Sequence, residues 1–315
     1  MKIGACDHTV HGQDHHNVWD QAIEPVLEVE PGAAVELETV DASGGQVHRG
    51  SVAADLGALD FTRVNPVTGP VFVRGARPGD VLEVEVLDLG MTDWGWTAIL
   101  PGFGLLADEF PDPWLKIWDL TPGAATAEFD EGIVISLAPF PGTLGVAPAR
   151  PGQFSVVPPD DWGGNLDTKH LTVGTKVYLP VGVEGACFSM GDTHAAQGDG
   201  EVCGTAIESP MRIAVRFQVR RDLALRQPAF ETFGGAPGDQ ATSGAFVTTG
   251  VADDLMRAAR QAVTAMIDHL GDHAGLDANA AYALCSVAVD LRIHEVVDAP
   301  NWVVGAWLPK GVIHR

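Results

Sequence analysis

Turn-forming residues interrupt this chain at short intervals, and that feature most limits what it can fold into. Its 315 residues include 37 glycines and 21 prolines, which separate short stretches rich in Val, Leu, Ile and Thr. This spacing is typical of many short strands. The stretch "PGDVLEVEVLDL" (78–89) alternates in this way and predicts a strand whose Glu83 and Glu85 face water. We therefore expect the first 245 residues to be mainly β.

The last seventy residues follow a different pattern. Apolar residues recur at helical spacing from Leu255 to Leu270, and Gly271 predicts the end of that helix. Asp277 is placed as the N-cap of a second helix, and a strand is expected within 287–297. The chain thus divides approximately into β parts at 1–150 and 151–232 and an α+β part at 233–315, which can pack as one unit. The Gly-rich tract 233–246 is either a linker or an active-site loop.

Charge and cysteine content exclude several classes of protein. Lys and Arg number 19 against 42 Asp and Glu, and the formal charge of −23 argues against nucleic-acid or anionic-membrane partners. The four cysteines are scattered without a C-x-x-C pair, so neither a disulfide framework nor a structural zinc knuckle is expected. No apolar run is long enough for a membrane span and no signal peptide is visible, so we expect a cytoplasmic protein.

The stretch "GDTHAAQGDGE" (191–201) places potential ligands among glycines. Asp192 and His194 are two residues apart, so in a strand both point to one face. Glu201 could return to that face after the "QGDG" turn. Carboxylates and an imidazole that converge in this way are typical of metal sites. The alternative is a solvated polar hairpin.

A second polar cluster, "DDWGGNLDTKHL" (160–171), precedes the first by about twenty-five residues. A strand, a turn and another strand between the clusters could bring 165–167 back beside 192–194. The N-terminal "HTVHGQDHH" is also able to bind a metal, although a His-rich terminus is more often solvated.

A covalent nucleophile is the other route to acyl chemistry. No G-x-S-x-G elbow is present, and neither a Walker loop nor a Rossmann fingerprint indicates a nucleotide. Cys203 follows Glu201 by two residues and could act as a thiolate on the same face, or it could be a small core residue. The Trp-rich tract 93–118 is either the rim of an apolar pocket or a buried plug.

The motifs "GGNLD" (163–167), "LPV" (179–181), "GDTHAAQGDGE" and "AIE" (206–208) together resemble those of the acetamidase/formamidase family. The resemblance extends from "LEVEPG" (27–32) to "DLRIHEVVDAPNWVVGAWLPK" (290–310), nearly the whole chain. It implies hydrolysis of formamide or acetamide to ammonia and the carboxylate. It also implies a mainly β enzyme with a jelly-roll-like sandwich, a barrel-like β part and an α+β C-terminal region.

The resemblance implies a divalent metal as well, with zinc favoured and calcium the alternative. Residues carried over as possible metal ligands are Asn165, Asp167, Asp192, His194 and His16. Residues expected to take part in catalysis are Asp192, Glu201 and Glu208. Residues expected to contact the substrate are Gly163, Gly164, Gln197 and Phe103.

Two other functions remain open at this level. One is a non-catalytic β-sandwich that binds a metabolite and holds structural calcium through oxygen ligands. The other is an amidase that uses Cys203 as its nucleophile. We expect a small amide as the substrate and a homodimer or homotetramer as the assembly, and the residues do not distinguish formamide from acetamide.

Overall fold

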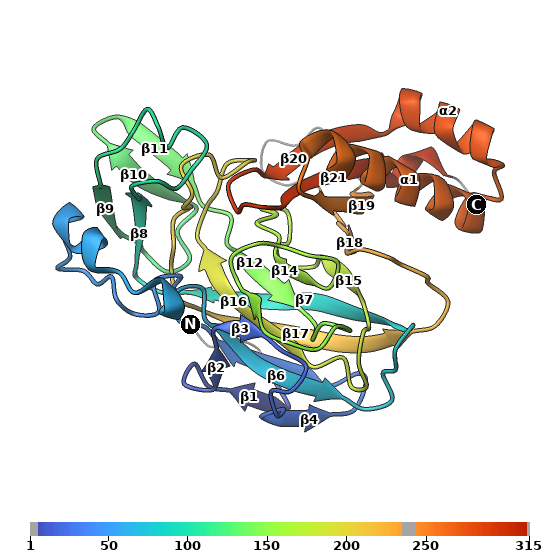
Figure 1. Cartoon of the computed structure of the whole chain (residues 1–315), viewed down its shortest axis with the longest axis horizontal. Coiled ribbons are helices and arrows are strands. Elements are labelled where there is room, and N and C mark those ends of the chain that lie inside the picture. Colours follow the sequence, from blue (N-terminus) through green and yellow to red (C-terminus); the bar gives the residue numbers. More distant parts are fainter. Residues whose placement is uncertain (1–5, 235–243, 314–315) are drawn as a thin grey trace.

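The computed structural model describes residues 6–234 and 244–313, and it confirms a mainly β protein with its helices near the C-terminus (Figure 1). The largest sheet has nine strands. From one edge to the other they are β1 (His8–Val10), β5 (Ala34–Glu38), β17 (Met211–Arg220), β7 (Val81–Met91), β15 (Lys176–Pro180), β18 (Ala229–Glu231), β19 (Ala245–Ala252), β21 (Trp302–Pro309) and β20 (Asp290–Glu295).

A second sheet has six strands, five of which follow one another across the sheet while the sixth pairs additionally with one of these five. Its order is β14 (Gly163–Asn165), β12 (Phe140–Gly145), β16 (Phe188–His194), β6 (Val67–Val73) and β2 (His15–His16), with β4 (Leu27–Val29) parallel to β6. Three strand pairs complete the β structure: β3 (Val18–Trp19) with β13 (Phe154–Ser155), β8 (Trp94–Ile99) with β9 (Trp114–Asp119), and β10 (Thr126–Asp130) with β11 (Ile133–Ser136). Short 3-10 helices lie at Ala53–Ala58, Phe61–Arg63 and Lys310–Val312.

The two large sheets pack against each other through one apolar core. Phe188 of the smaller sheet meets Phe217 of the larger one with ring centroids 5.2 Å apart, and both are fully buried. The strand order in each sheet runs from edge to edge, so the barrel-like part implied by the resemblance is not a closed barrel within the described residues. The nine-stranded sheet also takes strands from all three predicted parts of the chain, whose boundaries stay a prediction.

Strand β7 departs from its predicted pattern at Glu83. The alternation places this side chain toward water, but the residue is only 4% exposed. Because β7 lies inside the large sheet, basic residues of both neighbouring strands reach the carboxylate. Lys176 of β15 donates to Glu83 at 2.8 Å and Arg220 of β17 donates at 2.6 Å. Burial of the carboxylate is tolerated because these cations satisfy it.

The C-terminal helices cover β19 and β21 (Figure 1). Helix α1 (Leu255–Ala274) continues past Gly271, so that predicted end is wrong. The chain turns instead at Gly275, which has a φ of 65° and whose N–H bonds to the carbonyl of Gly271. Helix α2 (Ala278–Ala288) starts after Asp277, whose carboxylate caps it as predicted. Neither helix is long and apolar enough to cross a membrane.

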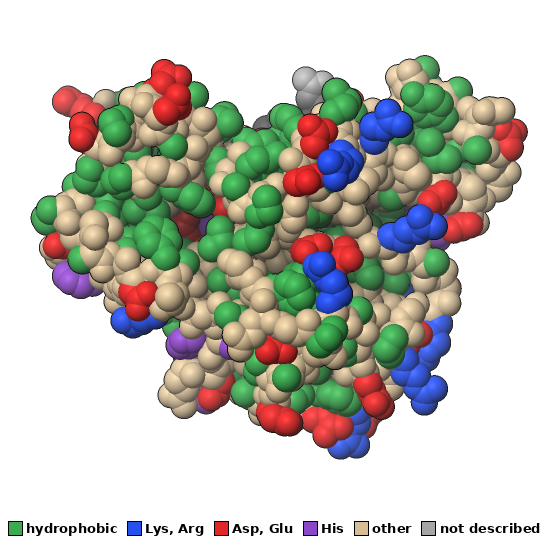
Figure 2. All heavy atoms as spheres, viewed as in Figure 1, with side chains coloured by type: hydrophobic (Ala, Val, Ile, Leu, Met, Phe, Trp, Pro, Cys, Tyr) green, Lys and Arg blue, Asp and Glu red, His purple; other side chains and the backbone are tan. Residues whose placement is uncertain are grey.

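The Trp-rich tract forms β8 and β9 and is partly buried. Trp96 and Trp118 are buried, whereas Trp114 and the neighbouring Leu105 and Phe110 are exposed. Figure 2 shows hydrophobic side chains gathered on the surface of this part of the molecule, at the upper left. Most of the Gly-rich tract 233–246 lies outside the described residues.

Candidate active site

Three neighbouring strands carry the polar motifs to one place. Strand β12 pairs with β14 on one side and with β16 on the other. The segments 165–167 and 192–194 therefore come together, as expected, but β12 lies between them. Gly142 of β12 makes this possible, because a Cβ there would lie 2.5 Å from Oδ1 of Asp167 and 2.7 Å from Cε1 of His194.

The imidazole of His194 lies at the centre of the site. Its Nδ1 is 2.9 Å from Oε1 of Gln197, whose amide nitrogen donates to the backbone carbonyl of Asp167 at 2.6 Å. Since Oε1 can only accept, Nδ1 carries a hydrogen. The other nitrogen, Nε2, lies 3.2 Å from Oδ1 of Asp192 and 3.1 Å from Oε2 of Glu208. Gln197 thereby directs Nε2 toward carboxylates.

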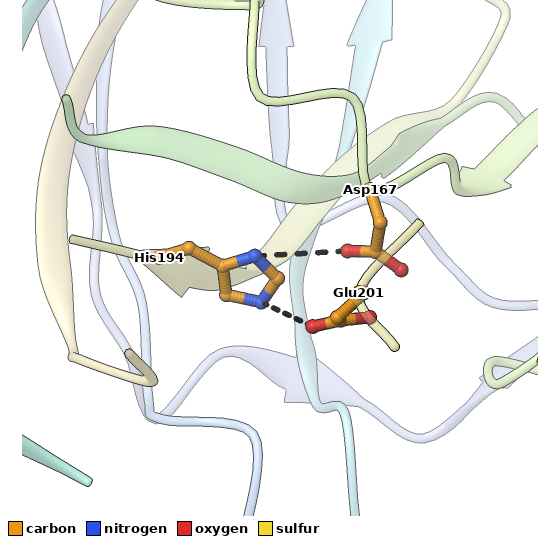
Figure 3. A group of neighbouring side chains, drawn as sticks. All are labelled: Asp167, His194 and Glu201. Carbon is orange, nitrogen blue, oxygen red and sulfur yellow. Dashed lines mark ion pairs between the residues drawn. The ribbon is translucent and has the colours of Figure 1, made fainter. Parts of the chain in front are cut away.

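Two further carboxylates lie beside the same ring, one near each of its nitrogens (Figure 3). Asp167 Oδ1 is 3.7 Å from Nδ1, and Glu201 Oε1 is 4.0 Å from Nε2. His194 thus belongs to two compact groups, one with Asp167 and Glu201 and one with Asp192 and Glu208, in each of which the potential ligand atoms lie within 4.8 Å of one another. All five residues are buried, with exposed fractions of 7% or less.

Several of these buried oxygens have no hydrogen-bond partner. Among the described residues none bonds to either carboxylate oxygen of Asp167 or to Oε2 of Glu208. A buried carboxylate without a partner is costly unless a proton or a cation neutralises it. The oxygens of this site therefore have unused capacity to bind a cation.

The pKa values of the site also indicate an excess of buried negative charge. Burial raises the pKa of Glu208 to about 8, and burial together with Asp167 raises the pKa of Glu201 well above its usual range. Burial works against the charged form of His194, but Glu208 and Asp192 outweigh it and raise the imidazole pKa. Burial also opposes ionisation of Asp192, yet His194 holds its pKa below the usual value. These shifts favour a positive charge among the carboxylates, which a protonated His194 or a bound cation can supply.

The backbone at the site is held in an uncommon conformation. Asp167, Asp192 and Glu201 have φ angles of 39°, 45° and 47°. Asn65, which donates to Asp192 Oδ2 at 3.2 Å, has a φ of 45°. A left-handed conformation at a residue other than glycine costs on the order of 1–3 kcal/mol and tends to concentrate at functional sites. These positions are therefore fixed by the surrounding structure rather than by local preference.

Other predicted site residues lie near this centre without joining it. His16 on β2 lies outside both groups, since its Nδ1 bonds to the carbonyl of Val18 and its Nε2 bonds to the hydroxyl of Ser189. Gly163 and Gly164 form β14 and pair with β12.

Phe103 and Cys203 lie together just beyond Glu201. The ring of Phe103 covers Gly204, where a Cβ would lie 2.3 Å from the ring. The thiol of Cys203 donates to the carbonyl of Thr205 at 3.4 Å and points toward that of Ala98 at 3.7 Å. No imidazole is among the bonding partners of this thiol in the described part of the chain.

The structure adds residues that the sequence patterns did not indicate. Asn165 donates to Asp298 at 2.6 Å and accepts from Thr143, so its amide is engaged by protein groups. Glu295 accepts the backbone N–H of Asp298 at 2.6 Å, and both carboxyls are buried. The stretch "EVVDAPN" that holds them matches the family resemblance, but its spacing alone predicts no site.

The structure is that of a mainly β protein in which buried carboxyls cluster around one imidazole. Residues 5–155 and 149–315 match the model of the Acetamidase/Formamidase family, so the chain belongs to this family of amide hydrolases.

Relatives agree with this assignment over most of the chain. A formamidase of Methylophilus methylotrophus is 28% identical, with 94% of this chain and 89% of the relative covered. An acetamidase from Bacillus halodurans has a solved structure with a TM-score of 0.86 at 32% identity, covering 95% of this chain and 96% of that one. A gamma lactamase from Delftia acidovorans is more distant in structure, with a TM-score of 0.69 at 27% identity and coverage of 98% and 94%.

Proposed function

We propose that this protein hydrolyses a short aliphatic amide, formamide or acetamide, to ammonia and the carboxylate with the help of a bound divalent metal ion. The observation that carries the proposal is the orientation of His194. Its Nδ1 is engaged by Gln197, and its Nε2 faces Asp192 at 3.2 Å and Glu208 at 3.1 Å. A nitrogen that faces two buried carboxylates is suited to hold a proton, or to bind a metal cation together with them.

The donor sets around His194 support a metal. Each of the two groups, Asp167 with Glu201 and Asp192 with Glu208, adds two carboxylates to the imidazole. Both oxygens of Asp167 are buried without a hydrogen-bond partner among the described residues. Imidazole together with carboxylates favours zinc or another transition metal, whereas calcium prefers a set made only of oxygens. We therefore propose zinc. Such an ion supplies a Lewis acid for the amide carbonyl and lowers the pKa of water from 15.7 to about 7.

Proton transfer belongs to the remaining carboxyls. Amide hydrolysis adds water to the carbonyl carbon and protonates the nitrogen, so one group accepts a proton from water and another donates one to the departing amine. Glu208 has a pKa near 8, caused first by burial, and is suited to hold the proton for nitrogen at neutral pH. Glu201, whose Oε1 lies 4.0 Å from the same Nε2 of His194, is suited to exchange the proton of water. Asp192 stays ionised and balances the central positive charge.

The test is ammonia release from formamide, acetamide and propionamide, together with ring opening of a five-membered lactam. The lactam is included because one structural neighbour is a gamma lactamase. Purified protein is assayed before and after chelation, with zinc or calcium added back. Release that is lost with the metal and restored by zinc supports the proposal. Release that survives complete removal of metal refutes the metal part of it.

Variants separate this proposal from the alternatives. Asp192→Ala is expected to abolish turnover, and full activity in a metal-replete Asp192→Ala protein would refute the assignment. A Cys203 nucleophile predicts inactivation by iodoacetamide and resistance to chelators, and a structural calcium site predicts no turnover of any amide. A cytoplasmic location and a homodimer or homotetramer stay predictions, the second measurable by light scattering.

A further inference from the structure

Backbone hydrogen bonds hold Asp167 on both sides of the residue. Neither of its carboxylate oxygens has a hydrogen-bond partner among the described residues. The backbone is held on both sides, because the N–H of Asp167 donates to the carbonyl of Gly142 at 3.1 Å and its carbonyl accepts from Gln197 at 2.6 Å. The preceding carbonyl, that of Leu166, accepts from the hydroxyl of Thr168 at 3.0 Å. This bond closes the turn that keeps Asp167 at a φ of 39°.

The hydroxyl of Thr168 is itself held by a buried imidazole of the C-terminal part. Nδ1 of His294, on β20, lies 2.9 Å from Oγ1 of Thr168. Nε2 of His294 lies 3.1 Å from the indole nitrogen of Trp307 on β21. His294 is 1% exposed and Trp307 is 3% exposed, so water does not compete for these bonds.

The hydrogen bonds that run from Trp307 through His294 and Thr168 to Leu166 each have a donor that follows from the chemistry of the groups. An indole N–H can only donate, so Nε2 of His294 accepts and the ring hydrogen is on Nδ1. Nδ1–H then donates to Thr168, and the single hydroxyl hydrogen of Thr168 is left for the carbonyl of Leu166. The tautomer of the ring is therefore set by its neighbours. The indole N–H of Trp307 thus determines which group donates in each of the following hydrogen bonds.

The strand beside the ring is shaped to admit it. Gly305 of β21 lies against His294, and a Cβ at this position would be 2.5 Å from both Cε1 and Nε2 of the ring and 2.8 Å from the indole nitrogen of Trp307. Glycine therefore leaves the space in which the ring and the indole meet.

We propose that His294, held as its Nδ1–H tautomer by Trp307, is a positioning residue that acts through the Thr168 hydroxyl to hold Asp167 in its site conformation. The inference rests on the proposed role of Asp167 in the proposed function. It assigns a part in catalysis to the C-terminal α+β region, which supplies both His294 and Trp307. Hydrogen-bonded partners of this kind typically change activity or metal affinity by about 10- to 100-fold when removed.

Matched variants test the chain of bonds at two points. Thr168→Val removes the hydroxyl at nearly constant shape, and Thr168→Ser retains it. At the ring, the amide nitrogen of His294→Asn can replace Nδ1 toward Thr168, whereas His294→Gln reaches only toward Trp307. We expect kcat to fall by about 10-fold or more in Thr168→Val and His294→Gln, with little change of KM, and the Ser and Asn variants to retain most activity.

A structural role alone would not give this pattern. Each variant is assayed well below its own melting temperature, and a fall in kcat that only follows thermal stability across the four variants refutes the proposal. Equal kcat in the Val and Ser variants refutes it as well. Nitrogen-15 NMR of histidine-labelled protein gives a readout independent of activity. The wild type is expected to have hydrogen on Nδ1 of His294, and Trp307→Phe is expected to give a mixture of tautomers.

Failure of this inference is distinguishable from failure of the proposed function. If Asp167→Asn retains full activity, Asp167 has no role in turnover, and the proposed function loses that ligand whatever the tautomer of His294. If Asp167→Asn is inactive while Thr168→Val and His294→Gln are as active as wild type, the proposed function stands and the positioning role is wrong. An Nε2–H tautomer in the wild type also overturns the inference.

Discussion

Replacing Gly142 with alanine tests the geometry of the candidate site most directly. The added Cβ would lie 2.5 Å from Oδ1 of Asp167, 2.7 Å from Cε1 of His194 and 2.8 Å from the backbone carbonyl of Asp192. Gly142 has no positive φ, so the substitution introduces no backbone strain and the penalty is steric alone. The backbone carbonyl cannot rotate away, and the two side chains must move apart.

The expected effect has one part in stability and one in activity. Overpacking of a close-packed interior costs about 1–3 kcal/mol. At about 2–4 °C per kcal/mol for a chain somewhat smaller than this one, that corresponds to a fall in melting temperature of about 2–12 °C. Displacement of catalytic groups by about 1 Å is enough to lower the rate by about 100-fold. We therefore expect a folded protein with a modest loss of stability and a large loss of kcat.

Gly198→Ala is the matched control for this variant. Gly198 lies in the loop that follows His194 and is exposed, and a Cβ added there would meet no atom within 4 Å. Ammonia release and thermal unfolding are measured for both variants in parallel. Wild-type kcat in Gly142→Ala would show that Asp167 and His194 need not approach across β12 for turnover. An equal loss in Gly198→Ala would show that the loss in Gly142→Ala does not come from this contact.

Three further predictions concern pH, metal and the thiol. His16 has its pKa lowered by burial to about 4, so the unfolded chain binds more protons below pH 6.5 and unfolding free energy falls as pH drops toward 4. His16→Gln should reduce that loss in denaturant titrations, by on the order of 3 kcal/mol. Glu208, with a pKa raised by burial to about 8, has the opposite sign: the metal-free protein should lose stability as pH rises from 4.5 to 8. Zinc at about 100 times its Kd should raise the free energy of unfolding by about 2.7 kcal/mol. A melting temperature that zinc does not change would contradict the metal assignment. Cys203→Ser should keep wild-type ammonia release, because its thiol bonds to backbone carbonyls rather than to a base; inactivity of a folded variant would contradict this.

Local patterns predicted much of the fold. The alternation at 78–89 predicted β7, and the apolar stripe after Asp254 predicted α1. The errors arose where distant residues decide the outcome. Glu83 follows the alternation but is buried, because Lys176 and Arg220 reach it from neighbouring strands. Gly271 has the residue type of a helix end, but the helix continues to a later glycine that takes the left-handed conformation.

The candidate site was predicted only in part, because local patterns reveal some of its residues and distant packing decides the others. Asp192 and His194 share a strand face because side chains alternate along a strand, and that is a local property. Asp298 and Glu295 could not be found in this way. They lie about a hundred residues further along and join the site only through the pairing and packing of the C-terminal region.

The sequence by itself determined the mainly β class, the strong negative charge, and the motifs that carry the resemblance to amide hydrolases. Only the tertiary structure decided that β12 lies between the two motifs, that Gln197 directs Nε2 of His194 toward Asp192 and Glu208, and that His294 reaches the turn of Asp167. The physical reason is that periodicity records which way a side chain points relative to its own strand. Which strands become neighbours, and which buried charges then face one another, depends on the packing of the whole chain.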